Sequence, residues 1–480
     1  MSRADILQSA ADHVLIRKRL GPENNMLVII SDLHLTDDTS GKTIRENAFG
    51  VFRERLRDMA FDASWRSDGK YKPIEKLDVL LLGDILDVIR SSRWIGAGIR
   101  PWNQPSDPLF SKTVAEITQA ILAKNAKSVE ILRSLSNGTI LTLPPATAEG
   151  KPELGVRERV PISVRLHAMV GNHDWFFHLP GDAYDQIRKI VVKELGLAND
   201  PLQPFPHDPQ ESEELQKVFA DHHVFARHGD IFDAFNFEEV RNASSLGDAI
   251  VIELINRFPV EVQRQLGSEL TGDCLVGLRE IDNVRPLLVV PVWINGLLRR
   301  TCIDNEQAAK VKAIWDKLAD DFLALDFVSK RLWTKRLFGS VAKLEWALKF
   351  SRGVSFGNLS EITSWVTRKL ASHDELFYPN AFGETAFKNR SARFIVYGHT
   401  HHHEIVPLDI FQSANGQVTQ IYINSGTWRA VHDQAQFHLQ EQEFAGYHVM
   451  TYLGFFKDDE RSGRPFETWS GSLGWKDTEG

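Results

Sequence analysis

Unbroken apolar runs that stop abruptly at polar residues recur along this chain. The clearest is LDVLLLGDILD, residues 77–87, in which Val and Leu residues end at a glycine and the carboxylate of Asp84. A run without polar alternation is typical of a strand that is covered on both faces. In sheets of such strands, ligands bind beyond the carboxyl ends. The run therefore predicts a buried strand that delivers Asp84 to a ligand-binding loop.

The same pattern occurs five more times. The runs are MLVIISDLHL, LHAMVGNHDW, HVFARHGD, FIVYGHTH and QIYINSGTW. The polar residues at their ends are Asp32, His34, Asn172, His173, Asp174, His228, His399, His401, Asn424 and Ser425. We expect these residues to gather at the carboxyl ends of neighbouring strands.

Apolar residues at helical spacing predict helices between these strands. The predicted helices are residues 1–20, 44–61, 112–135 and 184–195, and 112–135 is predicted as one long helix. Residues 417–457 predict two or three further strands, whereas residues 462–480 predict a loose tail. Prolines at 90–108 predict an ordered loop. Its Trp94 and Trp102 either pack beneath it or line the site, and packing is the commoner role of aromatic residues.

The length of the chain indicates more than one compact core. Its 480 residues exceed the roughly 250–300 at which a single core stops growing. Beyond His228 the alternation of strands and helices stops, and it resumes before His399. We therefore predict a core in two parts, residues 1–243 and 373–480, with a mainly helical insertion or lid at 244–372.

Composition excludes several classes of protein. A hydrophobic content of 42% and a charged content of 25% are ordinary for a globular protein. The net charge of -8 argues against general affinity for duplex nucleic acid. Cys274 and Cys302 are too few for a disulfide framework or a zinc knuckle. The first twenty residues lack the apolar core of a signal peptide, and no apolar run approaches the ~20 residues of a transmembrane segment. A cytoplasmic location is therefore expected.

Seven of the polar residues offer oxygen or nitrogen donors suited to a metal: Asp32, His34, Asp84, Asn172, His228, His399 and His401. This set without a thiolate suits Mn²⁺ first, and also Fe²⁺ or Zn²⁺. Seven donors are too many for one ion, so we expect two divalent cations about 3.5–4 Å apart. A carboxylate can bridge two cations where a neutral imidazole cannot, and Asp84 is the expected bridge. A hydroxide between such cations is a nucleophile near neutral pH, because coordination can lower the pKa of water to about 7.

The motifs SDLHL, GDILD, GNHD, HGD and GHTH, in this order and each after a predicted strand, resemble the calcineurin-like metallophosphoesterase superfamily. The resemblance covers roughly residues 26–90, 166–233 and 394–428 and leaves the insertion uncovered. It implies an α/β (α+β) fold, the four-layer αββα sandwich, here with a helical insertion. The site would lie on loops at the strand ends.

The resemblance also implies a role for each site residue. Asp32, His34, Asp84 and His401 would hold one metal, and Asp84, Asn172, His228 and His399 the other. His173 would be the outer-sphere acid or transition-state stabiliser, oriented by the carboxylate of Asp87.

Physical chemistry supports the role of His173 without the family. Phosphoryl transfer places charge on the leaving oxygen, where a positive donor helps, and a nearby carboxylate raises the pKa of such a histidine. Other histidines lack ligand spacing. We expect His13, His167, His207 and His438 to be surface or core residues, and His402 and His403 not to bind metal.

The expected activity is metal-dependent hydrolysis of a phosphate ester by a metal-bound hydroxide. Protein serine/threonine phosphatases carry Arg-Gly where this chain has Val88 and Ile89, and Glu where it has Asp174, so that class is dropped. The pairing of HGD with a later GHxH is similar to that in the bacterial UDP-diacylglucosamine pyrophosphatases. Those enzymes are shorter and usually have arginine in place of the histidine of GNH. The expected substrate is a phosphodiester, nucleotide or pyrophosphate-type small molecule, and monoester against diester stays open.

Two other classes of function remain open. The chain could be a binding or assembly module with structural metals, in which case loss of ligands would be tolerated, yet none is missing. It could also be a nuclease for short or single-stranded nucleic acid, which would need a basic track.

Residues 329–352 form a basic segment within this acidic chain, with seven Lys or Arg residues against Glu345. Trp333, Leu337, Val341, Leu344 and Leu348 lie at helical spacing, which predicts an amphipathic helix. The helix either packs on its neighbours, with solvated charges, or caps the metal site and contacts the substrate. An anionic lipid surface is an alternative partner.

Overall fold

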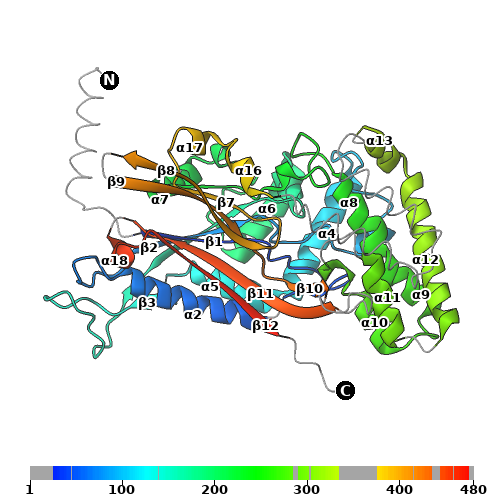
Figure 1. Ribbon diagram of the computed structural model, residues 1–480, viewed down its shortest axis with the longest axis horizontal. Coiled ribbons are helices and arrows are strands. Elements are labelled where there is room, and N and C mark those ends of the chain that lie inside the picture. Colours follow the sequence, from blue (N-terminus) through cyan, green and yellow to red (C-terminus); the bar gives the residue numbers. More distant parts are fainter. Residues whose placement is uncertain are drawn as a thin grey trace.

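The computed structural model of the protein describes residues 25–44, 46–138, 140–284, 290–301, 304–334, 376–413, 416–434, 444–457 and 459–474. The fold is mixed α/β, and both of its larger sheets contain parallel and antiparallel strand pairs (Figure 1). The predicted helix at 1–20, Cys302, His438 and residues 335–352 of the basic segment lie outside the described residues.

The first sheet carries the two apolar runs with the strongest strand signal. It has the order β10-β11-β1-β2-β5. Strands β10 and β1 pair with successive parts of β11, and β12 pairs with the other edge of β11. Its strands are β1 (Asn25–Ile30), β2 (Lys76–Leu82), β5 (Ser163–Met169), β10 (Ala430–Gln434), β11 (Phe444–Phe455) and β12 (Phe466–Gly474). Strands β1, β2 and β5 are parallel, so their carboxyl ends lie at one edge.

The second sheet is formed by the runs near HGD, GHTH and NSGTW. It has the order β6-β7-β9-β8, and β6, β7 and β9 are parallel. The strands are β6 (Val224–Ala226), β7 (Phe394–Tyr397), β8 (His403–Ser413) and β9 (Gly416–Ser425). A small hairpin pairs β3 (Thr142–Leu143) with β4 (Val160–Pro161).

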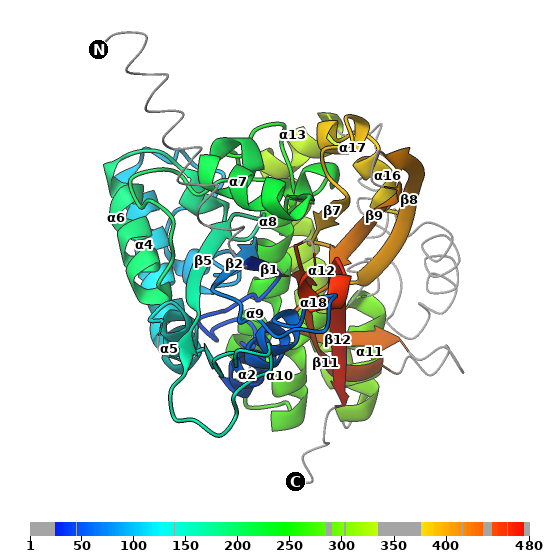
Figure 2. The ribbon, with the colours of Figure 1, turned by 90° about the vertical axis from the view of Figure 1, so that its left-hand side faces the viewer.

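The two sheets pack face to face through central strands that are buried on both sides, such as β1 and β2. Alternate residues of β1 and β2 share one core with the second sheet: Leu27, Ile29, Leu80, Leu82, Val224, Ala226, Phe394, Val396 and Ile423. The intervening residues of β1 and β2 face helices: α2 (Glu46–Ala63), α4 (Pro108–Lys124), α5 (Ala126–Leu135) and α6 (Asp182–Leu195). Figure 2 shows α4, α5 and α6 on one side of β5, β2 and β1 and the second sheet on the other.

The outer face of the second sheet also carries helices. Ile395, Tyr397 and Tyr422 pack there with α16 (Tyr378–Ala381) and α17 (Thr385–Lys388). Helix α7 (Glu213–His222) closes the core between the sheets. Short helical turns occupy the loops: α3 (Arg93–Gly96), η1 (Trp175–His178), η2 (Pro209–Glu211), η3 (Asp230–Phe232) and α18 (Glu460–Gly463).

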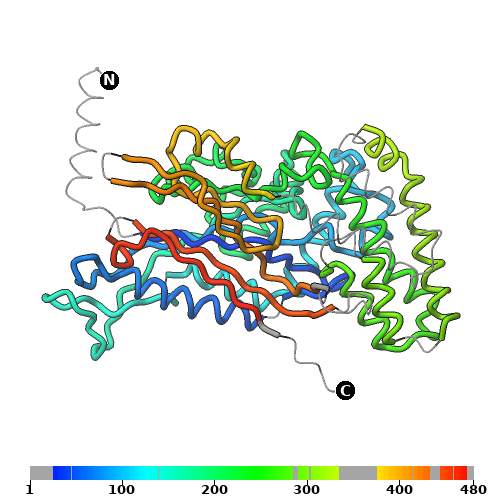
Figure 3. The backbone as a smooth tube through the Cα atoms, viewed as in Figure 1, coloured from blue at the N-terminus to red at the C-terminus, as the bar shows by residue number. Residues whose placement is uncertain are grey.

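Helices dominate the described part of the predicted insertion, and they share a hydrophobic cluster of their own. They are α8 (Leu246–Ile250), η4 (Val251–Asn256), α9 (Arg257–Leu266), α10 (Gly272–Leu278), η5 (Ile281–Asn283), α11 (Val290–Thr301), α12 (Asn305–Ala324) and α13 (Asp326–Thr334). Figures 1 and 3 place them at one end of the molecule, next to β10. Polar contacts join them to the strand-end loops, such as Trp175 Nε1 to Asp248 Oδ2 at 3.2 Å.

Two predictions of secondary structure were wrong. Residues 112–135 form two helices that meet at Asn125, whose Nδ2 donates to the carbonyls of Thr36 and Ile121, both at 2.8 Å. A buried asparagine that bonds to the backbone competes with helix continuation. Residues 466–474 of the expected tail form β12, which pairs with β11 along its whole length. The run FETWSGSLG hides this strand because serine and glycine interrupt its apolar pattern.

The tryptophans of the 90–108 loop have packing roles. Trp94 is fully buried, stacks on Phe176 and donates from Nε1 to the Val88 carbonyl at 2.8 Å. Trp102 stacks on Phe327 of α13. The loop also contains one short helix, α3.

The described end of the basic segment is partly structural. Arg331 lies 3.1 Å from Glu238 and stacks over the Phe327 ring. Trp333, the first residue of the predicted apolar stripe, is 72% exposed, so the stripe does not begin in a core. The contact of this segment with substrate stays a prediction. None of the described helices combines the length and apolar character needed to cross a bilayer.

Candidate metal centre

The nine residues predicted for the site lie on loops that directly follow five strands. They are Asp32 and His34 after β1, Asp84 and Asp87 after β2, Asn172 and His173 after β5, His228 after β6, and His399 and His401 after β7. The structure brings all nine together where the carboxyl ends of these strands meet. The two packed sheets thus contribute to one site.

Five of the predicted ligands have a backbone conformation that L-residues rarely adopt. Asp32 (φ 54°), His34 (φ 45°), Asp84 (φ 54°), His399 (φ 69°) and His401 (φ 64°) all lie in the left-handed region. Each such residue costs about 1–3 kcal/mol and persists only where its surroundings hold it. Here hydrogen bonds between loops do so: His34 N–H donates to the Asp84 carbonyl at 2.8 Å, and His399 N–H to Asp32 Oδ2 at 3.1 Å. Strained residues of this kind cluster at functional sites, which makes this set a candidate site.

Asp32, His34 and His401 form one group of donor atoms. Asp32 Oδ1 lies 3.3 Å from His401 Nε2 and 3.7 Å from His34 Nε2. The two Nε2 atoms of His34 and His401 are 3.1 Å apart. All three side chains are buried, so these atoms converge away from bulk solvent.

Asp84, His228, His399 and Asn172 form a second group. His228 Nε2 lies 3.3 Å from both Asp84 Oδ2 and Asn172 Oδ1. His399 Nδ1 lies 3.0 Å from the same Asn172 oxygen. The second group therefore combines two imidazole nitrogens, a carboxylate oxygen and an amide oxygen.

One oxygen of Asp84 faces both groups. Asp84 Oδ2 lies 3.6 Å from His34 Nε2 and 3.3 Å from His228 Nε2. The other oxygen, Oδ1, accepts the backbone N–H of His173 at 2.8 Å. This bond orients the carboxylate so that Oδ2 occupies the position a bridging ligand needs.

The hydrogen bonds behind the second group fix which ring nitrogens carry lone pairs. The Leu82 carbonyl accepts from His228 Nδ1 at 2.9 Å, and Asp233 Oδ2 accepts from His399 Nε2 at 3.0 Å. Neutral His228 and His399 therefore direct lone pairs at Asn172 Oδ1, which is itself an acceptor. Acceptors only 3.0–3.3 Å apart need a proton or a cation between them. This donor set fits a divalent metal.

The electrostatics of the site agree with that need for positive charge. Burial would lower the pKa of His228, but the charges of Asp84 and Asp32 raise it well above its ordinary value. Burial would raise the pKa of Asp84, but the charges of His228 and His173 lower it strongly. Asp84 is therefore ionised, and the site favours the cationic form of His228.

Asp87 connects the first group with His173. Its Oδ2 accepts from His34 Nδ1 and its Oδ1 from His173 Nδ1, both at 2.7 Å. The first bond leaves Nε2 of His34 free for a metal, and the second sets the ring position of His173. Burial lowers the pKa of His173, but the charges of Asp87 and Asp84 outweigh it and raise the pKa. The bond to Asp87 therefore favours the protonated form of His173 beside the donor groups.

Asp233 and Asn236 were not predicted and support the second group. Asp233 Oδ2 accepts from His399 Nε2 at 3.0 Å and from Asn236 Nδ2 at 2.7 Å. Asn236 Oδ1 in turn accepts from Asn172 Nδ2 at 3.3 Å, which directs Asn172 Oδ1 at the two histidines. Asp233 therefore positions two ligands at once. The sequence gives no spacing signal for it, because the contact depends on how the loop after HGD folds.

Asp174 and Arg241 also support the loops, a role that was not predicted for either residue. Asp174 accepts from Gly171 N–H at 2.7 Å and from Ile85 N–H at 2.8 Å, so it joins the loops after β5 and β2. Burial and the charge of Asp84 raise the pKa of Asp174 to about 6. Arg241 donates to the Gly171 carbonyl at 2.9 Å and to Asp230 at 2.5 Å.

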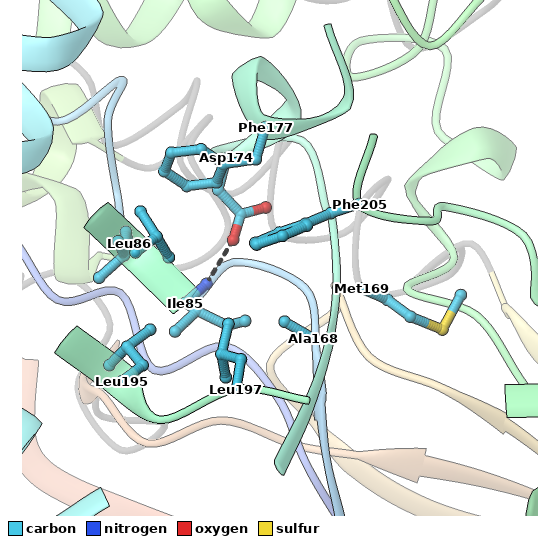
Figure 4. Close-up of a pocket in the computed structure, with 10 residues that line it drawn as sticks. Ile85, Leu86, Ala168, Met169, Asp174, Phe177, Leu195, Leu197 and Phe205 are labelled. Carbon is cyan, nitrogen blue, oxygen red and sulfur yellow. Dashed lines mark hydrogen bonds between the residues drawn. The ribbon is translucent and has the colours of Figure 1, made fainter. Parts of the chain in front are cut away.

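Figure 4 shows the Asp174 carboxylate above an apolar cavity, bonded to the Ile85 amide. Phe177, Leu195, Leu197 and Phe205 are among the residues that line it. The cavity volume is about 10 Å³, which suffices for at most one water molecule. It is therefore packing behind the loops and no substrate site.

The remaining candidate polar residues have structural partners. Asn424 Nδ2 donates to the Gly398 carbonyl at 2.8 Å, and Ser425 Oγ to the Tyr397 carbonyl at 3.0 Å, so both support the loop before His399. His167 pairs with buried Asp78 at 2.9 Å. Outside the two donor groups lie His402, which is exposed, and His403, which donates to the Asn424 carbonyl.

His178, His207 and Glu211 form another cluster in which a metal could be held. His178 donates to the Phe205 carbonyl, and His207 pairs with Glu211, which also caps η2. These hydrogen bonds give the polar side chains of the turn partners without a metal.

Comparison with protein-family models and with curated proteins finds no match to this chain.

Gly171→Ala is expected to weaken metal binding about tenfold or more. A Cβ at this position would lie 2.3 Å from Asp84 Oδ1 and 2.7 Å from His228 Nε2, so the loop must shift. Gly50→Ala in α2 meets no atom within 4 Å and should keep full metal content with slightly higher stability. Metal titration followed by elemental analysis compares them. Equal affinity in both variants would contradict the close packing of Gly171 on the site.

Asp233→Ala should lower metal affinity by about 10–100-fold, the usual effect of losing a partner behind a ligand. The change releases His399 Nε2 and, through Asn236, the amide of Asn172. Asp409→Ala removes an exposed carboxylate on β8 and is the control. Retention of tight binding by the Asp233 variant, measured by calorimetry, would show that the two ligands are held without this carboxylate.

Proposed function

We propose that the chain is a dinuclear-metal-dependent phosphoesterase that hydrolyses a phosphate ester, of the kind found in the calcineurin-like metallophosphoesterase superfamily. The observation that carries the proposal is Asp84 Oδ2, which lies between the two donor groups. Two packed sheets with helices on their outer faces support the αββα sandwich that the resemblance implies.

Each donor group would hold one of the two cations. Asp32, His34 and His401 with Asp84 would hold one cation, and His228, His399 and Asn172 with Asp84 the other. Mn²⁺ is the first choice, with Fe²⁺ and Zn²⁺ as alternatives, because the donors are oxygen and imidazole nitrogen. When bound, such a pair of cations lowers the pKa of a water molecule and neutralises charge on the phosphate.

His173 supplies the proton that the leaving oxygen needs. Asp87 fixes its Nδ1, so Nε2 is the atom left to donate. The side chain remains 13% exposed, unlike that of Asp87, and can reach a substrate from the open side of the site. Because Asp87 also holds His34, the acid and the first donor group keep a fixed distance from each other. Fixed geometry of this kind favours catalysis over simple metal storage.

The substrate proposed is a phosphodiester, nucleotide or pyrophosphate-type small molecule. A structural metal site in a binding or assembly module would need ligands but no protonated histidine held by a buried carboxylate. The Asp87–His173 pair therefore favours an enzyme. A screen of mono-, di- and pyrophosphate esters with each metal tests the class of reaction, and no hydrolysis with any metal would refute it.

Asp84→Asn should remove both hydrolysis and most of the bound metal, because the bridge loses the charge that holds two cations. Asp78→Asn is the matched control, since Asp78 is an equally buried carboxylate on β2, the strand that precedes Asp84, and is bonded to Arg165 and His167. Its folded fraction should keep the metal. Elemental analysis and turnover are measured on both variants. If the Asp84 variant retained both metals and near-normal turnover, Asp84 would not be the bridge.

His173→Ala should leave the metals in place and lower turnover by about 100–10,000-fold, as for a lost general acid. The loss should be smallest for esters with good leaving groups such as nitrophenolate. His167→Ala, which alters a core pair on β5, controls for stability. An equal loss across all leaving groups would assign His173 to charge stabilisation in place of proton donation.

A further inference from the structure

A second cavity opens beside His34, and its walls are charged. It has a volume of about 140 Å³, close to the ~150 Å³ of a cavity known to hold benzene. The side chains that matter here are His34, Lys42, Glu280, Asn283, Arg429 and His448. Because His34 belongs to the first donor group, the cavity adjoins the proposed metal site and is large enough for a substituent of the substrate.

Arg429 is the most notable residue of this wall. It follows β9 and is only 6% exposed. Its Nη2 donates to Asp282 Oδ2 at 2.5 Å and to Asn283 Oδ1 at 3.1 Å. Within the described residues its Nη1 has no hydrogen-bond partner. A buried guanidinium normally uses its several donors, so an unused donor on a residue that lines a cavity favours an acceptor from a ligand there.

Charge around the cavity favours an anion. Asp282 pairs with two cations, Arg90 and Arg429, while Glu280 pairs with Lys42 at 2.7 Å. These five groups carry three positive charges against two negative ones, and the carboxylates of Asp32, Asp84 and Asp87 also act on Arg429. The charge of two bound divalent cations next to His34 would outweigh these three carboxylates. The unpartnered Nη1 of Arg429 can donate a charge-assisted hydrogen bond to a carboxylate or phosphate.

Core and insertion share this cavity. Lys42 comes from the loop after β1 and Arg429 from the loop after β9, whereas Glu280 and Asn283 belong to the helical segment, at η5. The contact is reinforced where Val284 forms a bridge with His432 of β10. The helical segment thus holds Arg429 in place through Asp282 and Asn283.

We propose that this cavity, here called the Arg429 pocket, binds a second anionic group of the substrate, a carboxylate or a phosphate, while the scissile phosphate lies at the metals. The inference rests on the proposed phosphoesterase function and narrows its substrate class. Preferred substrates are then phosphate esters with a further anionic group on the part of the molecule away from the reacting bond.

The test uses nitrophenyl phosphate esters that carry an arm ending in a carboxylate, each matched to the neutral primary amide. A series of arms of increasing length shows at which length the carboxylate reaches the Arg429 pocket while the phosphate lies at the metals. At the best length, kcat/KM of the metal-loaded protein should be about tenfold or more higher for the carboxylate, the effect of one charge-assisted hydrogen bond. Dissociation constants of the matching phosphonates, which are not hydrolysed, should show the same preference.

Arg429→Gln should reduce the preference for the carboxylate to near one, and Arg429→Lys should keep part of it. Arg66→Gln is the matched control, because Arg66 is equally buried and binds carboxylates near the start of β1, at the other end of the strand. It should keep the full preference. If Arg429→Gln fails to fold, Lys42→Gln decides, since Lys42 is half exposed and its loss should lower the preference without unfolding.

The outcomes separate the two proposals. Hydrolysis by wild type without any preference for the carboxylate, or an unchanged preference in folded Arg429→Gln, overturns the Arg429 pocket and leaves the phosphoesterase standing. Failure of the metal-loaded wild type to hydrolyse any ester overturns the proposed function and this inference with it.

Discussion

Buried negative charge is the constraint on which the rest of this structure depends. Asp32, Asp84 and Asp87 have almost no exposed surface at the place where the two sheets meet. An ionised carboxylate in a protein interior costs several kcal/mol unless positive charge and hydrogen bonds offset it. Imidazoles surround these three carboxylates, and ring nitrogens of His228 and His399 lie 3.0–3.3 Å from the Asn172 oxygen, where a proton or a cation is needed. Such a site suits cations, and its loops adopt strained backbone conformations where the donors meet.

The packing of the sheets stabilises the fold enough to offset the strain and the buried charge of such a site. Strands β1 and β2 are buried on both faces, so the loops after them leave a rigid base. Gly83 begins the turn after β2 with φ 82°, and a Cβ there would lie 2.5 Å from His228 Nδ1. Only glycine lets the second sheet approach Asp84 so closely. The strain at the ligands is therefore held by a core that does not take part in the chemistry.

The sequence was most informative where one signal repeats. Each apolar run ending in polar residues became a strand, and the nine predicted site residues follow those strands, because a buried strand leaves a strong local pattern. Asp233 and Arg429 could not be found this way, since their roles depend on contacts between distant loops. The helix break at Asn125 and the strand β12 also arise from tertiary partners, which override weak local preferences.

The contact between the helical segment and the core positions a residue beside the candidate site. In the proposed phosphoesterase, a pair of metals would bind any phosphate group, so recognition of a particular ester would come from residues farther along the substrate. Asp282 and Asn283, at the edge of that segment, hold Arg429 beside His34. Substitutions in the helical segment can therefore change the position of Arg429 without touching a metal ligand. Under the proposed function, different parts of the fold would carry selectivity and hydrolysis, and the helical segment could vary while the donor groups stay fixed.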